Sequence, residues 1–368
     1  MKKKNLCKTL LKTMCIVLGI LILALLAYIV YLYASYYRIE DNQELVVEAP
    51  VDDTTTGAAA VLATDTEYSA VTYNIGFGAY LPDYSFFMDG GTSSWAESPE
   101  TVQYAINGAG ELVKSLDPDF ALIQEIDLDA TRSYHTDEYE MLRNILPEYT
   151  TVFAQNYDSA FLFYPFTQPH GSSRAGLGLF SKYPVSSALR RSFPISTSFS
   201  KFFDLDRCYS VSRIPVDNGK ELVIFNLHMS AYGNSDEIRK GQIEMLCNDM
   251  AKEYEAGNYV LCGGDFNHDL KASEEDAENC ESWAFPFPRT ELPEHFAFCL
   301  DLLSSEERES LWNSARNADM EYVPGVTYTV TLDGFIISDN IECLSYENVN
   351  TGYSYSDHDP VKVEFALK

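Results

Sequence analysis

The stretch that decides the fold is residues 259–267, which read YVLCGGDFN. Its leading apolar residues predict a short buried strand. That strand ends in two glycines followed by Asp265 and Asn267, side chains able to bind a metal ion or a phosphate. Residues 235–255 before it carry apolar side chains at helical spacing, and residues 221–228 (ELVIFNLH) precede this helix as another strand. Strand, helix and strand therefore follow one another in this part of the chain.

The same order occurs earlier in the sequence. Ser98 followed by Pro99 predicts the start of a helix with an apolar stripe, and Asp117-Pro118 ends it. The strands predicted around this helix and near the C-terminus are residues 70–73, 120–123, 326–338 and 361–367. Together these elements predict an α/β domain whose last strands are hairpin-like.

A long uncharged segment lies near the N-terminus. Residues 14–33 (MCIVLGILILALLAYIVYLY) would span ~30 Å as a helix, which matches the hydrocarbon core of a bilayer. Five lysines precede the segment and only Arg38 follows it closely, so the positive-inside rule places the N-terminus in the cytoplasm and the rest of the chain outside the cell. We therefore expect a single-pass anchor in the cell membrane. The alternatives are a cleaved signal peptide and a buried core helix.

The chain then divides into four parts. Residues 1–12 form a basic cytoplasmic stub, 13–37 the transmembrane signal anchor, and 38–66 an acidic linker rich in Thr and Ala. Residues 67–368 form one large folded domain. In an alternative interpretation, residues 46–51 (VVEAPV) are a strand on the edge of that domain.

Charge is distributed unevenly along this organisation. The formal net charge is -29, and six of the 26 basic residues lie in the first 38 positions, where no acidic residue occurs. The remainder holds 20 basic and 55 acidic side chains, a net charge of −35. Such an excess disfavours tight, unaided binding to nucleic acid, because phosphate contacts need Lys and Arg on one face. The aromatic content of 13% excludes a mainly disordered protein.

The eight cysteines carry no C-x-x-C pair, so a zinc ribbon or a thioredoxin-type site has no support. Cys247 and Cys262 lie in apolar runs and are expected to be core residues. Cys280 and Cys299 flank a loop-like stretch and could pair in an oxidising compartment, although the sequence does not fix connectivity.

Polar side chains end several of the predicted strands. An Asn or Asp after a strand is usually a turn residue, and a lone His is usually a satisfied polar group, so each has an ordinary explanation by itself. The recurrence at successive strands indicates a shared site. Asn74, Glu125, His228, Asp265 and Asn267 end or follow a strand. Asp333 interrupts residues 329–338 (TVTLDGFIIS), and Asp357 and His358 lie just before the last strand.

In chain order these residues read Asn, Glu, His, Gly-Asp-x-Asn, Asp and Ser-Asp-His, and this order resembles the endonuclease/exonuclease/phosphatase family from Ala70 to the C-terminus. Two blocks are specific: residues 264–267 (GDFN) after an apolar strand and residues 356–361 (SDHDPV) before one. Residues 176–184 (GLGLFSKYP) are similar to the family's mid-domain strand and turn. The resemblance implies a four-layer α/β/β/α sandwich of two packed mixed sheets, with the site where strands end at one rim.

The resemblance also implies roles. Glu125 would be the principal magnesium ligand, Asn74 would help to hold metal or phosphate, and Asp357 would approach the metal. In the catalytic set, Asp265 would orient or deprotonate the attacking water and Asn267 would bind the phosphoryl oxygens. His228 would stabilise the developing charge or protonate the leaving oxygen, while His358, oriented by Asp333, would bind the phosphate or transfer a proton. Gly334 stands where the family commonly has Tyr, which changes the expected pocket shape.

Other candidates for substrate contact are His170 and Arg174, with a surface role as the alternative. The loops at residues 77–95 and 156–174 are long and aromatic, as functional loops often are. Packing at the core or rim is the favoured interpretation of their rings, and contact with an organic leaving group or a lipid headgroup is the alternative. The only basic grouping, Arg190-Arg191 with Arg207 and Arg213, is interpreted as a solvated surface.

The sequence thus predicts a membrane-anchored, Mg²⁺-dependent phosphoesterase, with Mn²⁺ as the alternative ion, which hydrolyses phosphodiesters or phosphomonoesters by metal-assisted attack of water. Nucleic acid, a lipid headgroup and a small soluble phosphoester remain as alternative substrates. No stable protein partner is expected. An alternative from another class is a non-catalytic surface binding module on the same fold.

Overall fold

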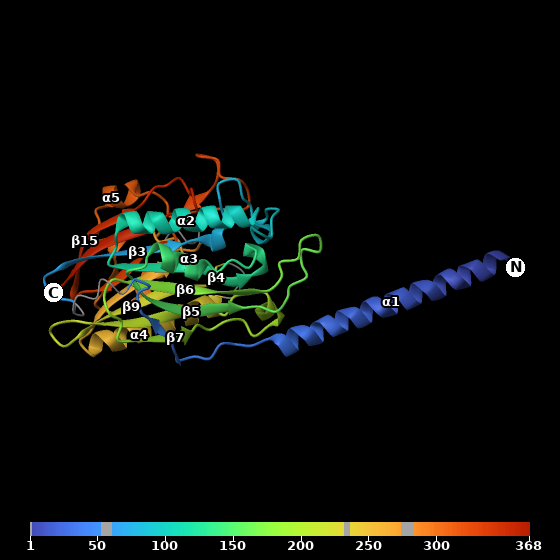
Figure 1. The fold of residues 1–368 in the computed structure, drawn as a ribbon, viewed down its shortest axis with the longest axis horizontal. Helices are drawn as coiled ribbons and strands as arrows, with labels where there is room; N and C mark the ends of the chain where they lie inside the picture. The colour runs from blue at the N-terminus through green and yellow to red at the C-terminus, as the bar shows by residue number, and fades with distance from the viewer. Residues whose placement is uncertain (1, 53–60, 232–235, 274–282) are drawn as a thin grey trace. The chain divides into compact units, whose positions relative to one another are not determined.

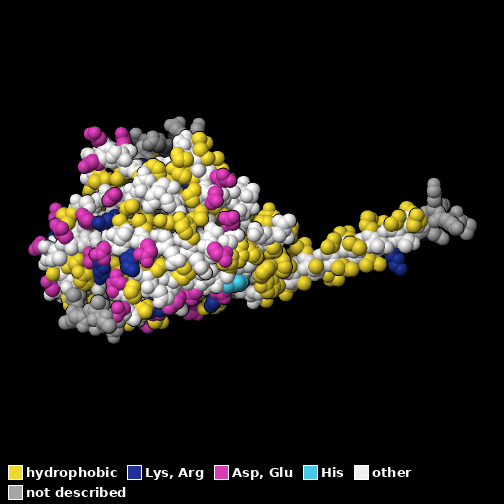
Figure 2. All heavy atoms as spheres, turned by 45° about the horizontal axis from the view of Figure 1, so that its top comes forward, with side chains coloured by type: hydrophobic (Ala, Val, Ile, Leu, Met, Phe, Trp, Pro, Cys, Tyr) yellow, Lys and Arg dark blue, Asp and Glu magenta, His cyan; other side chains and the backbone are white. Residues whose placement is uncertain are grey.

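The computed structural model describes residues 2–52, 61–231, 236–273 and 283–368. The chain separates into two units, Met1–Arg38 and Ile39–Lys368, which we describe individually. The first unit is helix α1 (Lys2–Ser35), along which hydrophobic side chains predominate (Figure 2). Its residues Leu6–Ser35 are long and apolar enough to cross a membrane, a property that a signal segment shares.

Two mixed sheets form the second unit, and each has seven strands among the described residues (Figure 1). The order in sheet A is β1 (Gln43–Glu44), β7 (Ser187–Ser192), β8 (Cys208–Pro215), β9 (Glu221–His228), β10 (Tyr259–Asp265), β14 (Asp333–Ser338) and β11 (Phe296–Phe298). The order in sheet B is β15 (Ile341–Asn348), β16 (Val361–Leu367), β3 (Glu67–Asn74), β4 (Phe120–Ala130), β6 (Ser173–Ser181), β5 (Thr150–Asp158) and β2 (Val47–Glu48). A small pair, β12 (Ala315–Arg316) and β13 (Thr329–Val330), lies outside both sheets.

The two sheets face each other and helices cover their outer faces, which confirms the four-layer α/β/β/α arrangement. Helices α2 (Pro99–Leu116) and α3 (Glu138–Ile145) pack on sheet B, while α4 (Asp236–Glu255) packs on sheet A (Figure 1). The short helix α5 (Ser305–Ser310) lies at the periphery. Buried polar contacts tie the sheets together, since Gln124 Nε2 of β4 donates to Asn226 Oδ1 of β9 at 2.8 Å.

Helix α2 begins and ends where the sequence predicts. The Ser98 hydroxyl accepts the backbone N–H of Thr101 at 3.1 Å, with Pro99 at the first helical position. Asp117 ends the helix in the left-handed conformation, and the following Pro118 prevents its continuation. The apolar stripe of α2 is buried against sheet B, including Val102, Ile106 and Val113.

The predicted late strand at residues 326–338 is wrong in its first half. Residues 326–328 are not in a strand, β13 covers Thr329–Val330 only, and β14 starts at Asp333. The physical reason is a change of partner, because β13 pairs with β12 whereas β14 pairs with β10 and β11. Asp333 therefore begins a strand rather than interrupting one.

The first part of the predicted 38–66 linker packs on the folded unit. Strand β1 pairs with β7, and β2 pairs with β5, so the alternative in which residues 46–51 supply an edge strand is confirmed. Ile39 is buried, and its carbonyl accepts from the Ser192 hydroxyl at 3.2 Å. Residues 53–60 of the predicted linker lie outside the described residues.

The cysteine predictions have mixed outcomes. Cys247 and Cys262 are buried in the core as expected. Cys280 lies outside the described residues, so its pairing with Cys299 stays a prediction. The buried thiol of Cys299 instead contacts the thiol of Cys343 on β15. Burial raises the pKa of Cys299, and the hydrogen bond with Cys343 raises it as well.

Candidate active site

Three of the predicted residues lie in one row across sheet A. Strand β10 pairs in parallel with β9 and antiparallel with β14, so Asp265 lies opposite His228 on one side and Asp333 on the other. All three side chains are buried. His228 Nε2 lies 3.5 Å from Asp265 Oδ2. The row brings His228 and Asp333, which are 105 positions apart in the chain, to either side of Asp265.

Sheet B supplies the facing half of the site. Strands β3 and β4 are parallel, with Asn74 opposite Gln124, so Asn74 and Glu125 reach the same rim. Asn74 Nδ2 donates to Glu125 Oε1 at 3.2 Å and to Asp265 Oδ2 at 3.1 Å. Asn74 Oδ1 accepts from the backbone N–H of Gly76 at 3.0 Å. Asn74 thus connects the two sheets by holding two carboxylates.

The backbone around these residues is locally strained. Glu125 has φ 56° and lies at an irregularity in the pairing of β4 with β6, which turns its side chain out of the strand's alternation. Asn267 has φ 50°. Gly264 has φ +147°, and a Cβ there would lie 2.0 Å from the carbonyl oxygen of Leu227, so only glycine fits between β9 and β10. Such strain concentrates at functional sites.

His358 and Asp333 form a buried pair. His358 Nδ1 lies 2.7 Å from Asp333 Oδ2, which also accepts the hydroxyl hydrogen of Ser314 at 2.7 Å. Burial alone would lower the pKa of His358, but the Asp333 carboxylate raises it well above its usual value, with Asp265 and Asp357 acting in the same direction. The His358 imidazole is therefore protonated. Its Nε2 lies 3.8 Å from Asp265 Oδ2.

His228 behaves in the opposite way. Burial lowers the pKa of His228 well below its usual value, and the charges of Arg207 and His358 act in the same direction. The site thus places a neutral and a charged imidazole on either side of Asp265, whose own pKa burial raises to about 7. This arrangement can divide proton transfer and charge stabilisation between two rings.

Several carboxyl groups crowd the rim beside Glu125. Burial, with the charge of Glu125 acting in the same direction, raises the pKa of Asp357 to about 6. Burial also raises the pKa of Asp89 to about 7, with Asp357 and Glu125 adding to the shift. Carboxylates that repel one another in a buried site fit a divalent cation, whose charge would relieve the repulsion. The ligand atoms of Asp265, Asp333 and His358 also lie within 4.8 Å of one another, a spacing that could hold a metal ion.

The structure adds residues that sequence reasoning missed. Ser314, from the segment before β12, fixes Asp333, and Asp89 joins the acidic group from the 77–95 loop. Arg207 precedes β8 and is buried, yet its Nε and Nη1 atoms have no hydrogen-bond partner. No sequence signal separates Ser314 and Asp89 from ordinary loop residues, and the sequence indicates for Arg207 only a surface basic grouping, because the fold alone brings them to the rim.

The predicted substrate contacts lie apart from this cluster. Arg174 is exposed and pairs with Asp129 at 3.2 Å. His170 is buried with its ring about 6 Å from those of Phe86 and Phe87, and burial lowers its pKa to about 3. Asn267 is nearer, since it directly follows the rim and its Nδ2 donates to Met229 O at 2.9 Å.

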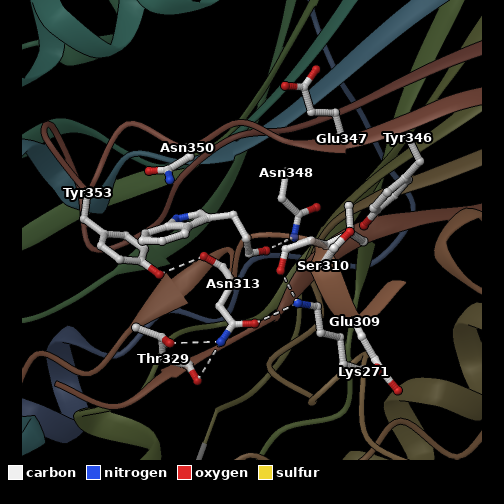
Figure 3. A pocket seen from close by; sticks show the side chains of 12 residues that line it. Lys271, Glu309, Ser310, Asn313, Thr329, Tyr346, Glu347, Asn348, Asn350 and Tyr353 are labelled. Atoms are coloured by element: carbon white, nitrogen blue, oxygen red, sulfur yellow. Dashed lines mark hydrogen bonds between the residues drawn. The ribbon is translucent and has the colours of Figure 1, made fainter. Parts of the chain in front are cut away.

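A separate hollow of about 560 Å³ lies between residues before β12 and the end of β15 with the segment that follows it (Figure 3). Its polar side chains mostly bond to one another or to the backbone. Asn313 Nδ2 donates to Thr329 at 2.9 Å, Lys271 Nζ to Asn313 at 3.0 Å, and the hydroxyl of Tyr353 to the Asn313 carbonyl at 2.7 Å. This network fixes Asn313 and so the segment that carries Ser314, whose hydroxyl donates to Asp333.

Comparison with known families decides the identity. A sequence model of the endonuclease/exonuclease/phosphatase family matches residues 71–302. The chain belongs to this family. Members are metal-dependent phosphoric ester hydrolases, and the protein is therefore a hydrolase of this class. The matched range contains Asn74, Glu125, His228, Asp265 and Asn267 and ends before the Asp333 and His358 pair.

Solved structures support the same fold. The chain is similar to an endonuclease/exonuclease/phosphatase from Beutenbergia cavernae DSM 12333, with TM-score 0.55, 14% identity, and coverage of 82% of this chain and 72% of that one. A family protein from Bacteroides vulgatus gives TM-score 0.53 and 17% identity over 83% and 100% of the two chains. D. rerio TDP2, solved with a single-strand DNA product, gives TM-score 0.55 and 14% identity over 82% and 100%. No curated protein matches the chain.

Proposed function

We propose that the protein is a membrane-anchored, Mg²⁺-dependent phosphoesterase whose centre is the cluster at the facing rims of the two sheets. The observation that carries this proposal is the convergence on Asp265, which lies within 3.1 to 3.8 Å of Asn74, His228 and His358 from three separate strands or loops. An anionic ester needs a site that neutralises charge, orients water and assists the leaving oxygen. This cluster contains groups for each task.

Glu125 and Asp357 are the metal ligands in this proposal, with Asp89 close enough to add to their field. Asn74 holds Glu125 and Asp265 in place through its amide, because its oxygen is occupied by Gly76. Bound Mg²⁺ would supply charge neutralisation at the phosphoryl oxygens.

Asp265 is the group that orients and deprotonates the attacking water. Its pKa near 7 matches a general base that works at neutral pH. His358, kept protonated by Asp333, donates a hydrogen bond to a phosphoryl oxygen, and neutral His228 stabilises charge or serves the leaving oxygen. Asn267 and the unpartnered donors of Arg207 bind the remaining phosphoryl oxygens.

The substrate is a smaller or lipid-bound phosphoester rather than a long polyanion. The predicted basic surface does not exist as expected, because Arg190 is 1% exposed and hydrogen-bonds backbone carbonyls. Arg191 pairs with Asp41 and Asp249, and Arg213 pairs with Glu221 and Glu253. Acidic side chains clearly outnumber basic ones on the visible face of the second unit (Figure 2). No continuous path of free cations for a nucleic-acid backbone is present among the paired arginines of β7 and β8.

Localisation follows from α1. We propose that residues 13–37 span the cell membrane with residues 1–12 in the cytoplasm, and that the catalytic unit lies outside. The apolar length of Leu6–Ser35 and the lysines before it support this topology.

The test is hydrolysis by the full chain in detergent. We expect turnover of bis-para-nitrophenyl phosphate with Mg²⁺, its loss with a chelator, and its abolition by Asp265→Asn. The matched control is Asp301→Asn, an acid on the periphery that pairs with Arg289 and Arg308. A folded chain that is inactive on a broad phosphoester panel with Mg²⁺ and Mn²⁺ would overturn the proposal.

A further inference from the structure

Two loops carry large aromatic side chains into solvent. The first is residues 159–172, between β5 and β6, where Phe163 is 50%, Tyr164 62% and Phe166 84% exposed. The second is residues 193–207, between β7 and β8, where Phe199 is 45% exposed. Exposed aromatic groups of this size mark an interaction surface. The prediction that the rings of the first loop pack at the core or rim is therefore wrong for its tip, whereas Phe77, Tyr80, Tyr84 and Phe86 of the 77–95 loop are buried.

The first loop is braced so that its rings remain outside. Leu162 and Gly171 exchange backbone hydrogen bonds of 3.0 Å across its base. The Ser94 hydroxyl donates to the Gln168 carbonyl and the Trp95 indole N–H to the Pro169 carbonyl, both at 2.7 Å. The hairpin projects beyond the ends of β5 and β6 as a green extension (Figure 1). An ordered loop with an apolar tip is suited to insertion into an apolar phase.

This hairpin rises from the active-site rim. In the strand register, Asp158, the last residue of β5, lies opposite Arg174 on β6. Arg174 lies opposite Asp129 on β4 on its other side. Asp129 is four residues beyond Glu125, so the base of the hairpin lies about 13 Å outward from the proposed metal ligand. The tip therefore lies further outward along the strand direction than Glu125.

The chain enters the folded unit at the same rim. Ser192, the last residue of β7, pairs with Cys208, and β8 continues the row to His228 and Asp265 through its pairing with β9. Three strand spacings separate Ser192 from Asp265, about 14 Å. Ser192 holds the entering chain in place. Its backbone N–H donates to Asp41 Oδ1 at 2.8 Å, and its hydroxyl donates to Ile39 O at 3.2 Å.

Buried Arg190 joins this entry point to both aromatic loops. Its guanidinium donates to the carbonyl of Glu40 at 3.2 Å, to that of Gln155 near the end of β5 at 2.7 Å, and to that of Asp206 at 3.0 Å. Asp206 closes the 193–207 loop. The entering chain and the two loops are thus held together by one side chain.

Helix α1 ends at Ser35, and Ile39 is already fixed on the folded unit. Four residues reach at most about 14 Å, so the connection between the anchor helix and the folded unit is short. We propose that Phe163, Phe166 and Phe199 insert into the outer leaflet of the membrane that α1 spans and seat the active-site rim on it. The substrate is then the phosphodiester of a lipid headgroup. This inference rests on the proposed anchor and hydrolase.

A membrane fits this surface better than a protein or a nucleic acid. The tip holds Phe and Tyr without a basic cluster, and aromatic rings are favoured at the interface between headgroups and acyl chains. The net charge of −35 beyond the anchor disfavours a membrane of anionic lipid, because like charges repel. Phosphatidylcholine is therefore a suitable probe, and it also presents a phosphodiester.

The docking is tested on the full chain in phosphatidylcholine vesicles whose acyl chains are brominated. Bromine quenches Trp fluorescence only on close approach, so Phe166→Trp should lose about half of its added fluorescence. The matched control is Leu344→Trp, because Leu344 is 42% exposed near the start of β15, at the end of the sheet away from the rim. Equal fluorescence of Phe166→Trp in brominated and unbrominated vesicles would overturn the docking. Release of the chain by alkaline carbonate would instead overturn the anchor and the inference with it.

The substrate class has its own test. Phe163→Ser combined with Phe166→Ser should lower hydrolysis of vesicle phosphatidylcholine about tenfold, because membrane binding scales with the apolar area inserted. Turnover of soluble bis-para-nitrophenyl phosphate should not change, which shows that the variant is folded and that the hydrolase proposal holds. Unchanged vesicle hydrolysis in this variant, or parent activity on the soluble ester with none on vesicles, would overturn the lipid assignment.

Discussion

Asp333→Asn provides the sharpest test of the paired residues behind the site. Asp333 is completely buried and lies 2.7 Å from His358 Nδ1. A hydrogen bond between charged partners contributes about 1.5–3 kcal/mol, and 1.36 kcal/mol corresponds to a tenfold change in rate. The substitution removes the charge but keeps the shape. We therefore expect kcat/KM at pH 7 to fall by roughly 10²-fold.

The pH profile adds a readout that a structural role would not move. Asp333 keeps His358 protonated, so Asp333→Asn should lower the pKa of His358. As the pH is raised, the activity of the variant should therefore be lost at a lower pH than that of the parent enzyme. Asp339→Asn is the matched control, because Asp339 contacts His295 at the same 2.7 Å but both side chains are about half exposed. A variant Asp333→Asn that keeps a third of its kcat/KM and the parent pH profile would refute the pairing.

Three further predictions test metal, acid stability and compartment. Glu125→Gln should raise the Mg²⁺ concentration for half-maximal activity about tenfold, and a metal titration with the same midpoint as the parent would contradict its role. The pKa of His170 is about 3 in the folded chain against 6.5 unfolded, so its contribution to stability is complete above pH 6.5 and decreases below it. From pH 7 to 5 this loss is about 2 kcal/mol, and denaturant unfolding should show it in the parent but not in His170→Phe. If the catalytic unit is exported, Cys299 and Cys343 should form a disulfide that intact mass under non-reducing conditions detects; free thiols on exported protein would contradict the expectation.

The sequence predicts the elements of this fold better than their ends. The helix after Ser98 and the strands at 221–228 and 361–367 are found where apolar periodicity and capping place them, because those signals are local. The strand at 326–338 is wrong because its length depends on a partner far away in the chain. Strand β15 is partly exposed and carries no strong alternation, so local pattern does not reveal it.

The site divides in the same way. Asn74, Glu125, His228, Asp265, Asp333 and His358 stand at strand ends in recognisable blocks, and the structure brings them together. Ser314, Asp89 and Arg207 act through loops whose positions are set by tertiary packing alone. Arg190 reads as a surface cation, yet it is buried because backbone carbonyls from three segments surround it. Its burial depends on contacts between distant parts of the chain, which the spacing of residues in the sequence does not predict.

The most direct test of the central claim is the position of a bound metal ion. Crystals of the protein grown or soaked with Mn²⁺ as an anomalous substitute for Mg²⁺ should show one strong peak in contact with the Glu125 carboxylate, at about 2.1–2.2 Å, on the side that faces Asp357. A Glu125→Gln crystal under the same conditions should lose that peak. A folded, active enzyme whose ion lies away from Glu125, or whose peak survives the substitution, would contradict the site proposed for this hydrolase.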